Sequence, residues 1–277
     1  MITFSKIGTH GRLGNQLFQT AILKVVSIKT GHEIVLPKNI NERHHHGQTC
    51  LLDNFKFNSI IYGDPIIKYS YSEKSDWGFD ERVFTVPDNT DFFGFFQNPK
   101  YYTPFQNDLI EEFKLIDEIE ETIDNVLEKY QNNTVSMHVR RGDMTDGTNP
   151  SLSNWANDVS ENSIVINYYK KALSLIPQNS TVFLFTGGSR SNNNQSDVEW
   201  CKQNFKDDRI IFVDFLNDIE SFALMKRCKY NITSFISTFS WWASFLNKNK
   251  NVIAPLNFYP NSDLEVENYY PKYWNLI

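Results

Sequence analysis

The sequence predicts an α/β protein built around a parallel β-sheet, and the C-terminal half carries the clearest signal. Three observations support this prediction. Short runs of β-branched and aromatic residues alternate with segments of helical periodicity from residue 134 onward. The chain has 277 residues, of which 40% are hydrophobic and 22% charged, so it can bury a core and exceeds one small domain. No internal repeat points to another class.

The second half predicts five strands with four intervening helices. Strands are expected over 134–140, 181–186, 209–215, 230–234 and 251–255, and helices over 167–176, 197–205, 218–228 and 238–247. Strands that alternate with helices in this way pair in parallel and place helices on both faces of one sheet. Ligands of such sheets bind beyond the carboxyl ends of the strands. The segments that follow these strands are therefore expected to border one site.

The first half also begins with a strand and a helix. A strand is expected over 2–7, a glycine-containing loop over 8–14, a helix over 15–30 and a strand over 33–36. Residues 39–90 show no sustained period, which predicts loops and short elements. A buried strand over 91–96 and helices over 104–113 and 117–130 follow. The polar stretch 131–133 predicts the boundary between a domain of residues 1–133 and one of residues 134–277.

The net charge and the cysteine content indicate which class of binding partner and which cellular compartment to expect. The net charge of −6 with a pI near 5.6 argues against a nucleic-acid partner. The N-terminus reaches a glycine-rich turn before any apolar segment, and no run of 18 apolar residues occurs. The three cysteines, Cys50, Cys201 and Cys228, are odd in number and scattered, as expected for reduced thiols. We therefore predict a cytoplasmic protein without stable membrane insertion.

The motif HVRRGD at 138–143 ends a predicted central strand. Alternation sends either Arg140 or Arg141 toward the interior, where an unpaired guanidinium is unfavourable. A bound pyrophosphate would match the planar donor fork of arginine, and Gly142 would let the chain turn beneath it. The alternative is a structural pair in which Asp143 neutralises an arginine.

A second segment, STFSWWASFL at 237–246, carries hydroxyls where a predicted strand leads into a helix. Ser237, Thr238 or Ser240 can cap this helix, and its open N–H groups can hold an anion. Capping alone is the alternative. The position at the same sheet edge as the arginines favours a phosphate.

The loop at residues 8–14 contains Gly8, Gly11 and Gly14 and leads into Asn15 and Gln16. Its spacing is neither that of a P-loop nor that of a dinucleotide fingerprint. The alternatives are a tight turn and a backbone that approaches a ligand. The three histidines 44–46 with Cys50 lack the spacing of one coordination sphere, and no D-x-D pair is evident, so no metal site is predicted.

Together, GRLGNQLFQ at 11–19, HVRRGD at 138–143 and STFSWWASFL at 237–246 resemble the signature blocks of the α-1,2-fucosyltransferases, glycosyltransferase family 11. The segment FGFFQNPKYY at 93–102 is similar to a further family segment. The resemblance implies a GT-B type fold with two Rossmann-like domains facing across a cleft and a donor-binding C-terminal sheet. It further implies GDP-fucose as the donor, inversion at the anomeric carbon and no cofactor or metal requirement.

The resemblance also assigns residues to the donor. Arg140 and Arg141 match the arginines of the donor motif, with Arg141 expected on the β-phosphate and Arg140 more important for stability. The remaining expected donor-side residues are His138, Gly14, Asn15, Ser237, Thr238 and Ser240. Family members commonly carry Ser-Asp-Asp after the strand at 181–186, whereas this chain has Thr186-Gly187-Gly188. Asp197 is therefore the candidate for guanine recognition.

For the reaction, the resemblance implies fucose transfer to the 2-hydroxyl of a terminal β-galactose, in oligosaccharide or glycolipid-precursor synthesis of the bacterial surface-glycan type. Arg141 and helix N–H groups would stabilise the leaving group, and Asp143 or Asp146 could serve as general base. Gln16 and Trp241 are acceptor-side candidates. The alternatives are another GDP-sugar transferase and a non-catalytic carbohydrate- or nucleotide-binding protein.

Overall fold

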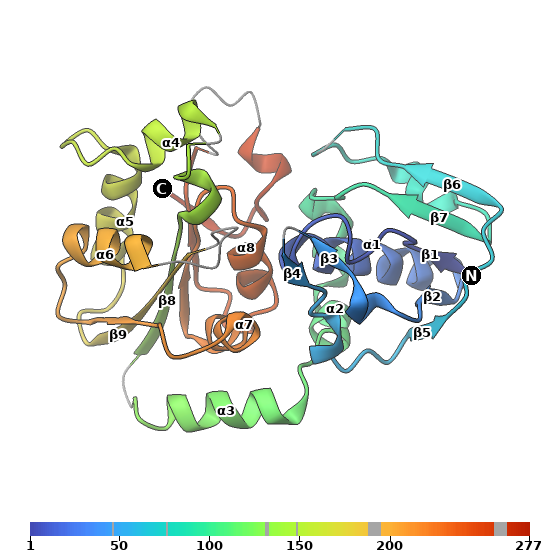
Figure 1. Ribbon diagram of the computed structural model, residues 1–277, viewed down its shortest axis with the longest axis horizontal. Coiled ribbons are helices and arrows are strands. Elements are labelled where there is room, and N and C mark those ends of the chain that lie inside the picture. The colour runs from blue at the N-terminus through green and yellow to red at the C-terminus, as the bar shows by residue number, and fades with distance from the viewer. Residues whose placement is uncertain (46, 76, 131–132, 148, 188–194, 258–264) are drawn as a thin grey trace. The chain divides into compact units, whose positions relative to one another are not determined.

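The computed structural model describes residues 1–277 except 46, 76, 131–132, 148, 188–194 and 258–264 (Figure 1). The chain forms two compact units. The first comprises Met1–Ile116 and Leu264–Lys272, and the second comprises Asp117–Asp263 and Tyr273–Ile277. Each unit has its own parallel sheet.

The described part of the first unit contains a five-stranded sheet. Its order is β5 (Ile60–Gly63), β2 (Ile34–Pro37), β1 (Ile2–Thr3), β7 (Thr90–Phe93) and β6 (Tyr69–Ser72). Every pairing is parallel. The sequence predicts β1, β2 and β7. Strands β5 and β6 fall in the stretch that was expected to hold loops and short elements. Both strands are short and lack fully buried residues. The sequence there therefore lacks the alternation of buried and exposed residues from which a strand can be predicted.

Helix α1 (Leu13–Thr30) contacts β1 and β2 and is buried along most of its length. It begins two residues before the predicted start, after Arg12, and ends at Gly31 with a left-handed φ of 75°. The first unit also contains α2 (Gln106–Glu112) and the antiparallel pair β3 (His44–His45) and β4 (Gln48–Thr49). Its short 3₁₀ turns are Ile40–Glu42, Leu52–Asn54, Glu81–Thr85, Pro99–Tyr101, Thr103–Phe105 and Val266–Asn268.

The second unit carries a six-stranded parallel sheet in its described residues. The order is β10 (Ile210–Phe212), β9 (Ser180–Gly187), β8 (Asn133–Arg140), β11 (Tyr230–Ile232), β12 (Val252–Ala254) and β13 (Asn275–Leu276). The five predicted strands are all present, and β13 was not predicted. Strand β8 lies inside the sheet, and its eight residues pair with β9 up to the register Arg140↔Gly187.

The helices of the second unit are α3 (Asp117–Leu127), α4 (Pro150–Ala156), α5 (Ile164–Leu175), α6 (Gln195–Asn204), α7 (Asp218–Arg227) and α8 (Thr238–Phe245) (Figure 1). All but α4 were predicted. Helix α4 is only seven residues long and starts at Pro150 after the Asn149 cap, so it offers too few turns for a periodic signal. The 3₁₀ turn Gly142–Met144 follows β8 directly.

The division between the units falls after Ile116 rather than near residue 133. Helix α3 packs on α7, and Arg227 contacts Asp124 at 2.6 Å and Glu120 at 3.4 Å. These ion pairs attach α3 to the second unit, although it precedes the first strand of that unit. Of the polar stretch expected at the boundary, residues 131–132 lie outside the described residues. No helix in the described part of the chain is long and apolar enough to cross a membrane.

Candidate functional site

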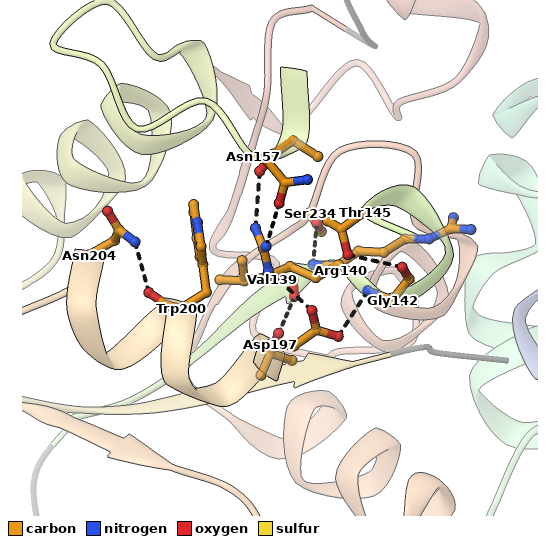
Figure 2. A network of polar contacts seen from close by, with 12 residues as sticks. Val139, Arg140, Gly142, Thr145, Asn157, Asp197, Trp200, Asn204 and Ser234 are labelled. Atoms are coloured by element: carbon orange, nitrogen blue, oxygen red, sulfur yellow. Dashed lines mark hydrogen bonds and ion pairs between the residues drawn. The ribbon is translucent and has the colours of Figure 1, made fainter. Parts of the chain in front are cut away.

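The carboxyl end of β8 positions the two adjacent arginines in different environments. The Arg140 side chain is 24% exposed and the Arg141 side chain 6%. Figure 2 shows Arg140 extending away from Asn157, Asp197 and Trp200. Strand alternation is the reason, because successive residues at the end of β8 project to opposite sides.

Three contacts fix Arg140 while leaving it partly accessible. Its backbone N–H donates to Ser234 Oγ at 2.8 Å, at the end of β11. Its guanidinium donates to the carbonyl of Ile236 and to Asp143 Oδ1 at 3.1 Å. Ile236 has a left-handed φ of 48°, a strained conformation for a β-branched residue. The strained turn thus directs a carbonyl at the guanidinium.

The Arg141 guanidinium is buried among acceptors of the protein. Nε donates to Asp197 Oδ1 at 3.2 Å, and the two terminal nitrogens donate to Ala156 O at 3.0 Å and Asn157 Oδ1 at 2.7 Å. The guanidinium carbon lies 3.9 Å from the ring centroid of Trp200. Burial lowers the pKa of Arg141, whereas the neighbouring Asp197 carboxylate opposes this shift. The guanidinium of Arg141 remains charged.

These contacts contradict the expectation that Arg141 meets a β-phosphate. A buried guanidinium whose three nitrogens all have protein acceptors has little to offer an incoming ligand. The partly exposed cation at this strand end is Arg140. The sequence-based assignment of the two arginines is therefore reversed, with Arg141 as the structural residue.

Asp197 lies in the first turn of α6 and is buried. Besides Arg141, it accepts the N–H of Gly142 on Oδ2 at 3.0 Å (Figure 2). Both carboxylate oxygens are thus engaged by the turn after β8, which corrects the prediction that Asp197 reads a guanine ring. Gly142 itself has φ of 47°, the left-handed conformation that glycine adopts without strain.

His138 is buried in β8 and its imidazole is neutral. Burial lowers the pKa of His138 to about 3, and Arg140 adds to the shift. Its Nδ1 lies 3.2 Å from Ser237 Oγ. The ring therefore supports the start of α8, and the burial excludes it from direct ligand contact.

Helix α8 begins at this same edge. Ser237 caps it by accepting the N–H of Ser240 at 3.3 Å, and Ser240 Oγ accepts the N–H of Ser234 at 3.2 Å. The N–H groups of Thr238 and Phe239 have no acceptor among the described residues. The capping interpretation is thus correct for Ser237, while Thr238 and these N–H groups remain able to bind an anion.

Trp241 is not at a surface. It is 0% exposed and packs against Phe245 at 4.8 Å, Trp242 at 5.0 Å and Trp274 at 5.7 Å between ring centroids. Its expected acceptor role is wrong, because α8 is buried along almost its whole length and its tryptophans belong to the core.

The glycine loop belongs to the first unit. Asn15 Oδ1 accepts from Gln97 Nε2 at 2.9 Å, and Gly14 is buried in the first turn of α1. Gln16 is buried, donates to Gly11 O at 3.1 Å and accepts from Leu51 N–H at 3.4 Å. Gln16 is thus committed inside its own unit, which leaves no free amide for the acceptor role expected of it.

Several residues of the arginine network were not predicted: Ala156, Asn157, Trp200, Ser234 and Ile236. One signal was available, since Asp197 and Trp200 are three residues apart on a helix and must share a face. Ala156 and Ile236 act through their carbonyls, Ser234 acts through its hydroxyl, and Asn157 directly follows α4, for which the sequence has no clear signal. The candidate bases Asp143 and Asp146 follow β8, the first beside Arg140 and the second exposed.

The family model of glycosyl transferase family 11 matches residues 3–277. The chain belongs to glycosyltransferase family 11. Among the described residues no group of three or more His, Cys, Asp or Glu side chains could hold a metal ion. His46 of the histidine run lies outside those residues.

The curated proteins that this chain resembles are distant from it in sequence. Galactoside alpha-(1,2)-fucosyltransferase 2 of Rattus norvegicus is 26% identical over 257 residues, which cover 87% of this chain and 66% of the rat protein. The alpha-1,2-colitosyltransferase of Escherichia coli is 24% identical over 294 residues, 95% of each chain. The O-antigen biosynthesis glycosyltransferase WbnK of Escherichia coli is 29% identical over 140 residues, 47% of this chain and 41% of that protein.

The solved structure of POFUT1 in complex with GDP has the same fold. It aligns with a TM-score of 0.55 at 13% identity over 91% of this chain and 96% of that one. A POFUT1 structure in complex with GDP-fucose aligns with a TM-score of 0.51 at 13% identity, over 90% and 94%. The predicted α/β fold of GT-B type is confirmed.

Proposed function

We propose that the protein transfers fucose from GDP-fucose to the 2-hydroxyl of a terminal β-galactose, with inversion at the anomeric carbon. Membership of glycosyltransferase family 11 and the names of the rat and Escherichia coli relatives support this proposal. The observation that carries it is the partly exposed Arg140 guanidinium, fixed beside the open N-terminus of α8 at the carboxyl edge of a parallel sheet.

In this proposal the second unit binds the donor. A nucleoside diphosphate brings negative charge that Arg140 can meet with its planar fork. Further hydrogen-bond donors are the N–H groups of Thr238 and Phe239 and the hydroxyl of Thr238. These donors are uncharged, so no additional charged group of the protein has to lose its water. As the bond between the sugar and the diphosphate breaks, the leaving oxygen gains charge, and these donors stabilise it without a metal.

The first unit is proposed to bind the acceptor, whereas Gly14 and Asn15 at the start of α1 stay proposed donor-side residues. The proposal includes a cytoplasmic enzyme acting on an oligosaccharide or a glycolipid precursor. The three buried free cysteines are consistent with reduced thiols.

The test is direct. Purified protein is incubated with GDP-fucose and lactose, GDP release is followed, and the product linkage is assigned by NMR. We expect GDP release that depends on lactose and a fucose on galactose O2. Fucose at another position contradicts the linkage, and no acceptor-dependent GDP release contradicts the activity.

A second candidate is transfer of colitose. The Escherichia coli alpha-1,2-colitosyltransferase matches 95% of both chains, a fuller match than that of the rat protein. Parallel assays with GDP-fucose and GDP-colitose distinguish the two donors by kcat/KM.

A further inference from the structure

The carboxyl edge of the first sheet carries three stacked aromatic rings. Strands β1 and β7 are neighbours in this sheet, and the segments at their carboxyl ends supply the rings. The imidazole of His10 lies on the ring of Phe95, with centroids 4.5 Å apart and planes at 12°, and on that of Phe93 at 5.1 Å and 26°. Phe93 ends β7 and is 48% exposed, whereas His10 and Phe95 are half-buried. The stack therefore presents a phenyl ring to solvent.

A strained turn after β7 carries Phe95. Its next residue, Phe96, is buried in the core with a left-handed φ of 55°, a conformation that bulky residues rarely adopt. Glu73 Oε2 accepts the N–H groups of Phe95 at 2.7 Å and Phe96 at 2.8 Å, and the Glu73 N–H donates to Phe93 O at 2.9 Å. A Cβ added to Gly94 would lie 2.5 Å from Glu73 Cβ. One carboxylate packed closely against the turn thus maintains its strained shape.

A buried amide joins the turn to the loop that follows β1. Gln19 of α1 is buried, and its Nε2 donates to His10 O at 2.8 Å and to Gly94 O at 3.5 Å. The backbone on both sides of the ring stack is therefore fixed by polar groups of the same unit. Rings that are already in place lose little conformational freedom when a ligand packs on them, as is typical of preorganised binding sites.

The His10 ring adds polar atoms to this apolar surface. Its nitrogens have no hydrogen-bond partner among the described residues. Its neighbour His45, 6.5 Å away between ring centroids, instead has Nδ1 at 3.0 Å from Thr9 O. Burial lowers the pKa of His10 from 6.5, and His45 lowers it further. The His10 imidazole is therefore neutral near pH 7, with one N–H donor and one acceptor nitrogen.

An open phenyl ring beside a neutral hydrogen-bonding group matches the chemistry of a neutral sugar. A pyranose has C–H groups on its faces and hydroxyls around its rim, so it can pack on an aromatic ring and hydrogen-bond at the ring's edge. In galactose the axial 4-hydroxyl leaves the C–H groups of carbons 3, 4 and 5 together on the opposite face. Glucose, with an equatorial 4-hydroxyl, lacks this continuous C–H face. The three stacked rings offer no charge, which favours an uncharged ligand.

We propose that the Phe93 ring is the surface on which a terminal β-galactose packs, with a hydroxyl of that sugar hydrogen-bonded to an imidazole nitrogen of His10. The inference rests on the proposed function, which assigns the acceptor to the first unit. Phe95 stacks on the imidazole and keeps its plane in place. The subsite holds the sugar and breaks or forms no covalent bond. It therefore contributes to the affinity and choice of the sugar, and every residue that it needs belongs to the first unit.

The experiment follows lactose binding to the full-length protein, saturated with GDP, by saturation-transfer NMR. The galactose protons on carbons 3, 4 and 5 are expected to receive the strongest saturation, and cellobiose, which differs from lactose in the terminal 4-hydroxyl, is expected to bind more weakly. Phe93→Ala is expected to weaken lactose binding about tenfold, whereas Phe93→Tyr keeps a ring and should retain it. His10→Phe keeps the stack without its nitrogens and should also weaken binding.

Tyr69→Ala is the matched control. Tyr69 is 53% exposed and begins β6 at the opposite, amino edge of the same sheet. Its removal is expected to leave lactose binding unchanged. GDP affinity by calorimetry and the thermal midpoint are expected to stay at wild-type values in all of these variants, because the substituted side chains are at least partly exposed.

The outcomes separate this subsite from the proposed function. Wild-type lactose affinity in Phe93→Ala or His10→Phe overturns the subsite, even if the enzyme transfers fucose to lactose. If neither variant folds, the wild-type spectrum decides, and even saturation of the galactose protons or absence of lactose binding overturns the subsite. If lactose binding depends on Phe93 but no fucose is transferred from GDP-fucose, the subsite stands and the proposed transfer fails.

Discussion

Two adjacent arginines can have opposite roles although each carries the same charge, because their surroundings differ. Arg141 is enclosed by Asp197, Asn157 and the ring of Trp200, whereas Arg140 keeps part of its guanidinium open. The sequence allowed the prediction that one of them faces inward. It did not allow us to say which, because the deciding carboxylate is 56 residues away on α6.

Arg140→Ala is expected to weaken GDP binding while leaving the fold intact. One charge-assisted contact contributes about 1.5–3 kcal/mol, which is roughly 10- to 100-fold in Kd. Calorimetric titration with GDP measures the loss. Unchanged GDP affinity would remove Arg140 from the donor site.

Arg141→Ala is expected to lower the free energy of unfolding by about 3–5 kcal/mol, because it leaves the buried Asp197 carboxylate without its cation. Urea denaturation of the variant measures this effect. Arg82→Ala is the control, since Arg82 forms an ion pair with Asp80 while 65% exposed, and solvent screening leaves such exposed pairs with little effect on stability. Equal effects of the two substitutions would contradict the structural role of Arg141.

His138 predicts a dependence of stability on pH. Its pKa is about 3 in the folded protein and 6.5 ordinarily, so the unfolded chain binds more protons between these values. Stability is therefore fully present above pH 6.5 and decreases as pH falls toward 3. From pH 6.5 to pH 5 the loss from this residue is about 2 kcal/mol. Denaturation of wild type and His138→Gln at both pH values tests it, and parallel losses would refute the assignment.

At the scale of elements, regular burial determined what the sequence could predict. Strand β8 alternates with helices around it and buries five consecutive residues, so its type and central place were predictable. Strands β5 and β6 contain no fully buried residue, and α4 spans only seven residues. Local patterns of that size do not separate a strand or helix from a loop, and only tertiary pairing defines them.

The glycine loop before α1 gives an element-scale prediction. A Cβ added to Gly11 would lie 2.4 Å from Asn15 Cβ, and Gly11 has φ of 95°. Gly31 at the other end of α1 has φ of 75° but nothing within 4 Å of an added Cβ. Gly31→Ala is expected to cost about 1 kcal/mol, and Gly11→Ala substantially more, because it also clashes. Comparable unfolding free energies for the two variants would show that the loop yields to the added atom.

At the scale of the whole molecule, two α/β units were predictable from the order of elements, but their division was not. Helix α3 joins the second unit through ion pairs with α7, and the sequence places these partners about a hundred residues apart. Contacts of that kind leave no local pattern. The family blocks therefore predicted the fold better than the domain boundary or the role of each side chain.

A whole-enzyme prediction concerns metals. Because Arg140 and the N-terminus of α8 supply positive charge, transfer is expected to continue at the same rate after dialysis against EDTA. GDP release with lactose before and after chelation measures this. A loss that Mn²⁺ or Mg²⁺ restores would contradict metal-free charge neutralisation.

The alternation at the end of β8 has a consequence for how this chain can change over evolution. Inserting or deleting one residue in β8 would exchange the two sides of the strand. The cation held by Asp197 would then face outward, and the partly open cation would be driven inward without its carbonyl partner from Ile236. Side chains in β8 can be replaced by others of similar size, but the strand cannot change in length. Insertions are tolerated in surface loops, where no register is set.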